Sequence, residues 1–233
     1  TASLGIWSNR SRSHNTYTTN ATSPLTAAPL YAYTNSGRSV SDYMYMDGSI
    51  DYQRLFKLPG RMLTLSYKLN GGTDKGDYNS AYDVMEVTDD WRAFMYRLRD
   101  ERRDDDGRSM EHTLQVDYTT PIAKAHTMEM GVKYIFRDNR SNDDRYIRPN
   151  GTADEYVFDD EYSTHYRHEN DILAAYLGYG LKLGKLSGRL GVRYEHTFQK
   201  IKYALGVGEN FSTDFDDVVP SVSLGYRLND AQS

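Results

Sequence analysis

Side chains able to hold a metal ion gather in the last third of this sequence. His165 and His168 are followed by Glu169 and Asp171, and imidazole and carboxylate groups are common ligands of zinc and related ions. A spacing of three residues brings two histidines together on a helix, yet Glu169 opens a segment that we predict below to be a strand. We therefore interpret the histidines as ordinary polar residues of a connection and predict no metal site.

Two acidic runs, Asp104–Asp106 and Asp159–Glu161, offer the hard oxygen ligands that calcium prefers. Neither run has the fixed ligand spacing of a calcium-binding loop. Charged runs in long connections are usually solvated, so we predict no ion at either place.

No catalytic motif is present. The sequence has no Gly-rich phosphate loop, no H-E-x-x-H and no nucleophile elbow. It has no cysteine, which excludes disulfides, thiolate metal sites and cysteine nucleophiles. Its 28 Lys and Arg residues are dispersed and the formal net charge is -5, so no nucleic-acid partner is indicated. We predict that the protein is not an enzyme and has no cofactor.

Apolar and polar residues alternate along much of the chain. The apolar or aromatic side of segment 188–200 falls on the even positions Leu190, Val192, Tyr194, His196 and Phe198. A period of two indicates a strand with one apolar face. The same pattern predicts eight strands, at residues 2–14, 42–56, 61–72, 110–122, 127–139, 169–183, 186–202 and 215–229.

The predicted strands are long. Most have about 12 residues, where about 5–6 are usual in soluble sheets, and at about 3.3 Å per residue they reach about 40 Å. Tilted by about 40°, such a strand crosses a hydrocarbon layer about 30 Å thick. No run of about 18 apolar residues is present, so no transmembrane helix is predicted.

Short and long connections alternate strictly. The short ones are Lys57–Gly60, Ala123–His126 and Gly184–Lys185, and the long ones are residues 15–41, 73–109, 140–168 and 203–214. Barrels of the bacterial outer membrane have short turns on the periplasmic side and long loops outside. We predict an all-β fold, an antiparallel up-and-down transmembrane β-barrel with about eight strands in this chain; the family resemblance given below implies that they are part of a larger barrel. Residues 1–233 are predicted to form one unit.

The longest connection carries Trp91, Phe94, Met95 and Leu98 at helical spacing. A short amphipathic helix fits this spacing, but the run Met95–Arg99 also alternates as a strand would. The sequence leaves both alternatives open.

Charged residues on the polar side of the strands are the candidate functional residues. Those expected to face the lumen are Lys133, Arg137, Arg189, Arg193 and Glu195. Inward charges can select a passing solute, or they can pair across neighbouring strands, and pairing is favoured for any single residue. Six of the 21 tyrosines are expected to contact outer-membrane lipid from the apolar side, as interfacial anchors: Tyr67, Tyr118, Tyr134, Tyr179, Tyr194 and Tyr226.

Several strand segments resemble a known family. The run Asp117-Tyr118-Thr119-Thr120-Pro121 ends one strand, Gly191-Val192-Arg193-Tyr194-Glu195 follows a tight turn, and the segment from Pro220 to Tyr226 reads P-S-V-S-L-G-Y. These motifs are similar to those of the outer-membrane β-barrel family related to TonB-dependent receptors, over residues 43–229.

The resemblance implies a bacterial outer-membrane location and a parent barrel of about 22 strands around an N-terminal plug domain. It also implies uptake of an unknown solute powered by the TonB system. The sequence shows no plug-like or TonB-box-like segment and ends Asp-Ala-Gln-Ser rather than on an aromatic residue. We therefore expect a barrel fragment without a plug. Two alternatives remain, namely a complete eight-stranded structural or adhesive barrel and a soluble β-sandwich that binds sugars.

Overall fold

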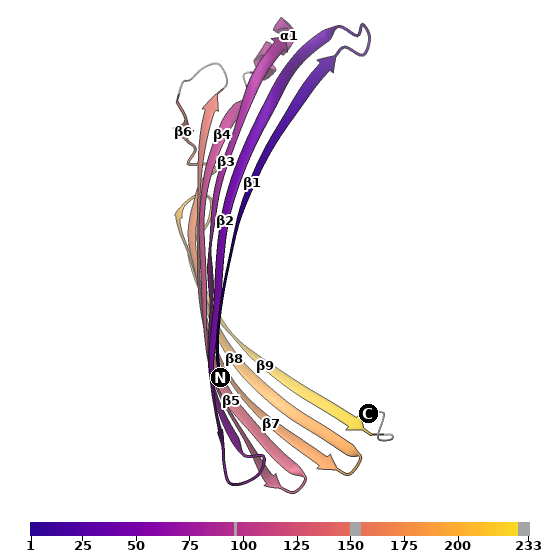
Figure 1. The fold of residues 1–233 in the computed structure, drawn as a ribbon, viewed down its shortest axis with the longest axis vertical. Helices are drawn as coiled ribbons and strands as arrows, with labels where there is room; N and C mark the ends of the chain where they lie inside the picture. The colour runs from indigo at the N-terminus through magenta and orange to yellow at the C-terminus, as the bar shows by residue number, and fades with distance from the viewer. Residues whose placement is uncertain (96, 150–154, 228–233) are drawn as a thin grey trace.

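The structure is a computed structural model that describes residues 1–95, 97–149 and 155–227. In this part of the chain it contains nine strands in a single sheet and one short helix (Figure 1). The elements are β1 (Ala2–Thr22), β2 (Pro29–Leu55), β3 (Met62–Val87), α1 (Asp89–Met95), β4 (Arg99–Ala123), β5 (His126–Pro149), β6 (Val157–Phe158), β7 (Thr164–Leu183), β8 (Leu186–Leu205) and β9 (Phe211–Tyr226).

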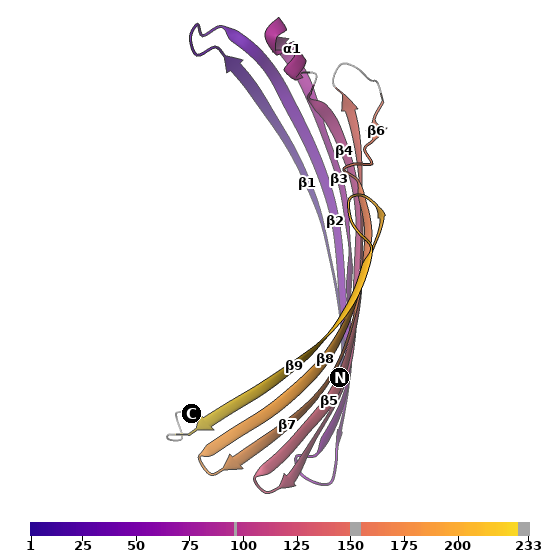
Figure 2. The same cartoon turned by 180° about the vertical axis from the view of Figure 1, so that it is seen from behind.

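The sheet is an antiparallel meander. Its strand order is β1-β2-β3-β4-β5-β7-β8-β9, and the two-residue strand β6 pairs beside β5. The eight long strands are those predicted from the sequence, although residues 228 and 229 of the last predicted strand lie outside the described part. The sheet is long, twisted and curved, and β1 and β9 form its two open edges (Figures 1 and 2). The described strands therefore form a wall that does not close on itself.

The two faces of the sheet differ as the alternation predicts. We call the face that carries Leu173 and Leu177 the apolar face; these side chains are 51% and 48% exposed. The opposite face, here the polar face, carries Ala174 and Thr197, which are 0% and 3% exposed. A curved sheet crowds the side chains of its concave side, so the polar face is the concave one. The apolar residues thus point outward without a second protein layer over them.

Tight turns close the end of the sheet where the predicted short connections lie. Gly60 has φ of +82° and Gly184 has φ of +60°, in the left-handed region that glycine adopts without a steric penalty. The N–H of Arg61 donates to the carbonyl of Leu58 at 3.0 Å within the first of these turns. From these turns to the row of Phe136 and Phe198, the apolar face is mostly aliphatic and aromatic, and we call this zone the apolar belt.

The four long connections predicted from the sequence are wrong in extent, because most of their residues continue the strands. Strand β2 has 27 residues and begins at Pro29, and β5 runs on to Pro149. Beyond the belt both faces are polar, so the alternation disappears although the backbone pairing continues. Alternation of apolar and polar residues marks a strand only where its two faces have different environments, so it does not mark these strand ends.

The open question in this connection is settled as a helix for residues 91–95, whereas residues 97 and 98 are not helical and residue 96 lies outside the described part. α1 covers Asp89–Met95, with Asp89 and Asp90 in its first turn, where carboxylates favour the positive end of the helix dipole. Leu98 follows in a turn, its N–H donating to the carbonyl of Met95 at 3.1 Å. Among the described residues no helix has the length and apolar character needed to span a membrane.

The assignment of the apolar face to lipid can be tested at the middle of the apolar belt. Val132 lies on the apolar face and is 49% exposed. We expect Val132→Lys to lower the free energy of unfolding in lipid vesicles by about 2–4 kcal/mol, the cost of a cation on the lipid face at mid-depth. Denaturant titration of the full-length protein measures it. Lys133→Arg, one residue along on the polar face, is the control and should change stability little; equal losses would contradict the assignment of faces.

Candidate functional site

The five charged residues predicted to face a lumen all lie on the polar face. They occupy the odd positions of β5 and β8, in line with Ile135 and Thr197 of that face. Arg137 donates through Nε to Glu111 of β4 at 2.5 Å, and Arg193 donates to Glu195 of its own strand at 2.6 Å. Arg137 therefore pairs across neighbouring strands, as favoured from the sequence, whereas Arg193 and Glu195 pair within a single strand.

Arg189 pairs with a residue two strands away. Its guanidinium binds Glu129 of β5 across the intervening strand β7. The bridge passes Gly178, whose missing Cβ would lie 3.6 Å from the Glu129 Cβ and 3.8 Å from the Arg189 Nε. Lys133 stands opposite Gln115 in the β4–β5 ladder and takes part in none of the ion pairs recorded between described residues.

A second bridge of this kind was not foreseen from the sequence. Tyr176 of β7 lies across β5 at Gly131 and donates its hydroxyl to Asp117 of β4. Gln115 donates to the same hydroxyl at 3.0 Å. The Arg193 guanidinium lies 5.9 Å from the Tyr176 ring centroid, a cation–π distance. The only sequence signal for this network is a glycine at a polar-face position, which predicts space but not what fills it.

The polar face is hollowed beyond the level of the belt. A depression of about 420 Å³ lies over β2, β3, β4 and β5. Gly107 leaves space in its floor, whereas the Asp105 carboxylate lies over Gly76, 2.9 Å from where a Cβ would be. The side chains around it are hydroxyls and carboxylates for the most part, including Ser39, Ser41, Asp74, Asp105, Ser141 and Asp143. We call this depression the acidic hollow.

Negative charge accumulates in the acidic hollow. Burial raises the pKa of Asp105, and the neighbouring Asp143 raises it further. The positive charge of Arg103 acts on Asp105 in the opposite direction and lowers its pKa. The same guanidinium lies 3.8 Å from Asp143 and donates to Glu101 at 3.0 Å. The hollow therefore combines several carboxylates with one nearby cation, which favours a ligand that carries positive charge or many hydroxyl groups.

Aromatic rings lie further along the same face. Tyr31 and Tyr33 stack at a centroid distance of 6.2 Å, and Tyr33 contacts Tyr82 at 5.7 Å. The helix α1 adds Trp91 and Phe94, whose ring centroids lie 5.1 and 5.8 Å from that of Tyr31. The helix thus joins the aromatic end of the polar face, a role that its sequence spacing alone did not indicate.

The metal-ligand patterns of the sequence do not assemble. His165 and His168 lie on opposite faces of β7, and His165 bonds Asp144 at 2.7 Å. Asp104 and Asp106 point away from Asp105 because strand neighbours alternate, and Asp159 lies 3.9 Å from Arg145. Within the described ranges no three His, Asp or Glu side chains converge as a metal site would require.

The six tyrosines expected as lipid contacts all lie on the apolar face. Tyr67 hydrogen-bonds to His112 at 2.8 Å and Tyr194 donates to Asp216 at 2.5 Å. Tyr134 and Tyr179 bond Asp171 and His126 in the same way, and Tyr118 and Tyr226 lie nearer the short turns. In the four tyrosines with hydrogen-bonded hydroxyls, the ring points outward and the hydroxyl has a partner, as expected of interfacial tyrosines.

Comparison with known proteins gives a family match. The model of the outer membrane protein beta-barrel family matches residues 54–233. No curated protein matches the sequence.

Three solved structures match over almost the whole chain. They are the unliganded ferric citrate transporter FecA (12% identity, TM-score 0.42, 98% of this chain and 42% of that one), the ferric yersiniabactin uptake receptor FyuA from Yersinia pestis (12%, 0.42, 97% and 40%) and the alcaligin outer-membrane receptor FauA from Bordetella pertussis (15%, 0.41, 98% and 41%). This chain therefore spans about two fifths of the length of the structures it matches.

The electrostatics of the acidic hollow predict a pH-dependent stability. A carboxyl whose folded pKa is raised destabilises the fold once it ionises, so its favourable contribution is present at low pH and is lost as the pH rises. We expect Asp105→Asn to raise the melting temperature at pH 7 and to make little difference at pH 3, where the wild-type carboxyl is protonated. Circular dichroism in detergent measures both. Asp106→Asn, on the opposite face, is the control; an equal gain there would show that Asp105 has no special environment.

Proposed function

The chain belongs to the outer-membrane β-barrel family, and from this premise we propose that it is part of the barrel wall of a transporter resembling TonB-dependent receptors. Its place is the bacterial outer membrane. The apolar belt contacts lipid, and the polar face lines the path along which a solute is taken up. In this proposal a plug domain and the TonB system act with the wall, and both belong to the whole protein rather than to these residues.

The observation that carries the proposal is the polar face itself. It is polar over the whole length of the sheet, with paired charges at the level of the belt and the acidic hollow beyond it. A polar inner face is what a barrel with a water-filled or plugged interior requires. A depression lined by hydroxyls and carboxylates, outside the membrane level and followed by aromatic rings, is suited to hold a polar solute before it passes inward.

The geometry favours a part of a large barrel over the two alternatives. The described sheet has open edges of 21 residues in β1 and 16 in β9, whose backbone groups need partners in lipid. Further strands of the parent barrel supply those partners. A soluble sandwich would cover Leu173, Leu177 and their neighbours with a second sheet, and the described residues provide none.

Uptake can be tested in cells that lack the full-length gene and receive it on a plasmid. We expect the wild-type protein to speed the disappearance of at least one small molecule from the growth medium, measured by mass spectrometry, and an uncoupler of the proton-motive force to abolish the difference. Transport is refuted if no compound is depleted faster with the gene than without it.

A variant that fills the acidic hollow tests whether the solute passes through it. A Cβ at Gly107 would meet its nearest neighbour, the Asp74 carbonyl oxygen, at 3.4 Å, so a side chain fits there and extends into the hollow. We expect Gly107→Trp to slow uptake several-fold at equal surface expression. Ala81→Trp, exposed on the opposite face, is the matched control. Equal uptake rates for the two variants would show that the hollow is not on the transport path.

A further inference from the structure

Four cationic residues form a straight row on the apolar face. Arg108 of β4 pairs in register with Arg140 of β5, Arg140 with Arg167 of β7, and Arg167 with Lys202 of β8. All four side chains leave the sheet on the lipid-facing side, because each lies an even number of positions from a belt residue of its own strand. We call these four residues the cation row.

The height of the cation row matches a lipid headgroup layer. About 15 residues of β5 separate Arg140 from the tight turn after β4, which at about 3.3 Å per residue and a tilt of about 40° is about 38 Å along the membrane normal. A bilayer measures about 30 Å across its hydrocarbon and about 40–45 Å with its headgroups. With the tight turns at the periplasmic surface, the cation row lies among the headgroups of the outer leaflet.

The row is only partly neutralised by the protein. One step closer to the belt lie Asp138, Glu169 and Lys200, in register with one another. Arg167 binds both carboxylates, at 2.7 and 2.8 Å, and Arg140 lies 3.4 Å from Asp138. Arg140 and Arg167, the two central residues of the row, therefore share the carboxylates of Asp138 and Glu169.

The residues at the two ends of the row, Arg108 and Lys202, differ from the central pair in their ion pairing. Arg108 and Lys202 take part in none of the ion pairs recorded between described residues. Asp106 lies one step beyond Arg108. On β4, β5, β7 and β8, the cation row and the rows on either side therefore hold five Lys or Arg residues and three carboxylates, and Lys75 of β3 stands opposite Asp106, in a chain whose total charge is -5.

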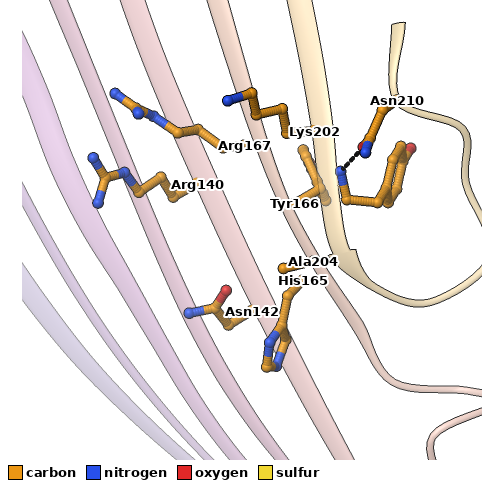
Figure 3. A pocket seen from close by; sticks show the side chains of 9 residues that line it. Arg140, Asn142, His165, Tyr166, Arg167, Lys202, Ala204 and Asn210 are labelled. Atoms are coloured by element: carbon orange, nitrogen blue, oxygen red, sulfur yellow. Dashed lines mark hydrogen bonds between the residues drawn. The ribbon is translucent and has the colours of Figure 1, made fainter.

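A local depression lies beside the cation row. Arg140, Arg167 and Lys202 extend side by side at one end of a depression of about 440 Å³, with Asn142 and His165 at its other end (Figure 3). Guanidinium and amide N–H groups facing one open space make a site for an anion with several acceptor oxygens, such as a phosphate. Two steps below the cation row, past Asp138, Glu169 and Lys200, Phe136 and Phe198 begin the apolar belt, where acyl chains would lie.

We propose that the cation row is a binding site for the phosphate groups of an outer-leaflet lipid, with Arg108 and Lys202 contacting phosphate at its two ends. The occupant is a phosphorylated glycolipid whose acyl chains lie against the belt. The cations of the row would bind the phosphates, the apolar belt below them would contact the acyl chains, and the row lies at the height of the headgroups. A soluble protein partner would not use the apolar part of this surface. The site faces away from the proposed solute path and is independent of it.

The test uses the full-length protein in detergent and native mass spectrometry with lipid A that carries two phosphates. We expect the wild type to retain this lipid and the double variant Arg108→Gln/Lys202→Gln to bind it about 30-fold more weakly, since each cation near an anionic membrane surface contributes about fivefold in affinity. Arg108→Lys/Lys202→Arg keeps both charges and should restore binding. Lipid A without phosphates should bind the wild type as weakly as the Gln variant binds the phosphorylated lipid.

The matched control is Arg38→Gln/Arg102→Gln, which removes two cations from the same face about six residues further from the belt. It should leave lipid binding unchanged. The proposal is overturned if this control loses as much affinity as the row variant, if dephosphorylated lipid A binds equally well, or if millimolar inorganic phosphate displaces the lipid. Loss of uptake without loss of lipid binding, or the reverse, distinguishes failure of the proposed function from failure of this site.

Discussion

Backbone hydrogen bonding in lipid is the constraint on which the whole structure depends. Where water is absent, every N–H and C=O must find a partner within the protein, and a strand can do this only through its neighbours. The β3–β4 ladder is paired from Met62 to Ser80 without an irregularity, and the β4–β5 ladder slips only next to the tight turn, between Pro121 and Ala123. The sheet is therefore a continuous lattice in which each residue has a defined height and face.

A continuous lattice brings residues that are far apart in sequence into transverse rows. The cation row joins four residues of four strands simply because their ladders share one register. The same lattice explains why polar side chains interact over more than one strand. Tyr176 and Arg189 each cross a neighbouring strand to reach a carboxylate, and a glycine, Gly131 or Gly178, lies where each of them crosses. Polar-face glycines are thus part of the side-chain network rather than gaps in it.

The strands also carry a sequence of chemical zones from one end of the sheet to the other. Tight turns come first, then the apolar belt with its tyrosines, then the cation row on one face and the acidic hollow on the other. At nearly the same height, the two faces carry opposite charge. The two proposals together explain this difference in charge. Cations on the outer face would meet anionic headgroups, and carboxylates on the inner face would line the solute path.

The strand segments within the belt, the tight turns at Gly60 and Gly184, and the face on which Arg137, Arg189 and Glu195 lie could all be predicted from the residue pattern. These follow from local rules, because a period of two reports a difference between the two faces of one strand. The residue pattern did not predict how far β2 and β5 extend, which carboxylate each arginine contacts, or that Arg108, Arg140, Arg167 and Lys202 form one row; these were seen only in the folded sheet. Register between strands depends on pairing across the sheet, and where both faces are wet the alternation that would mark a strand is absent.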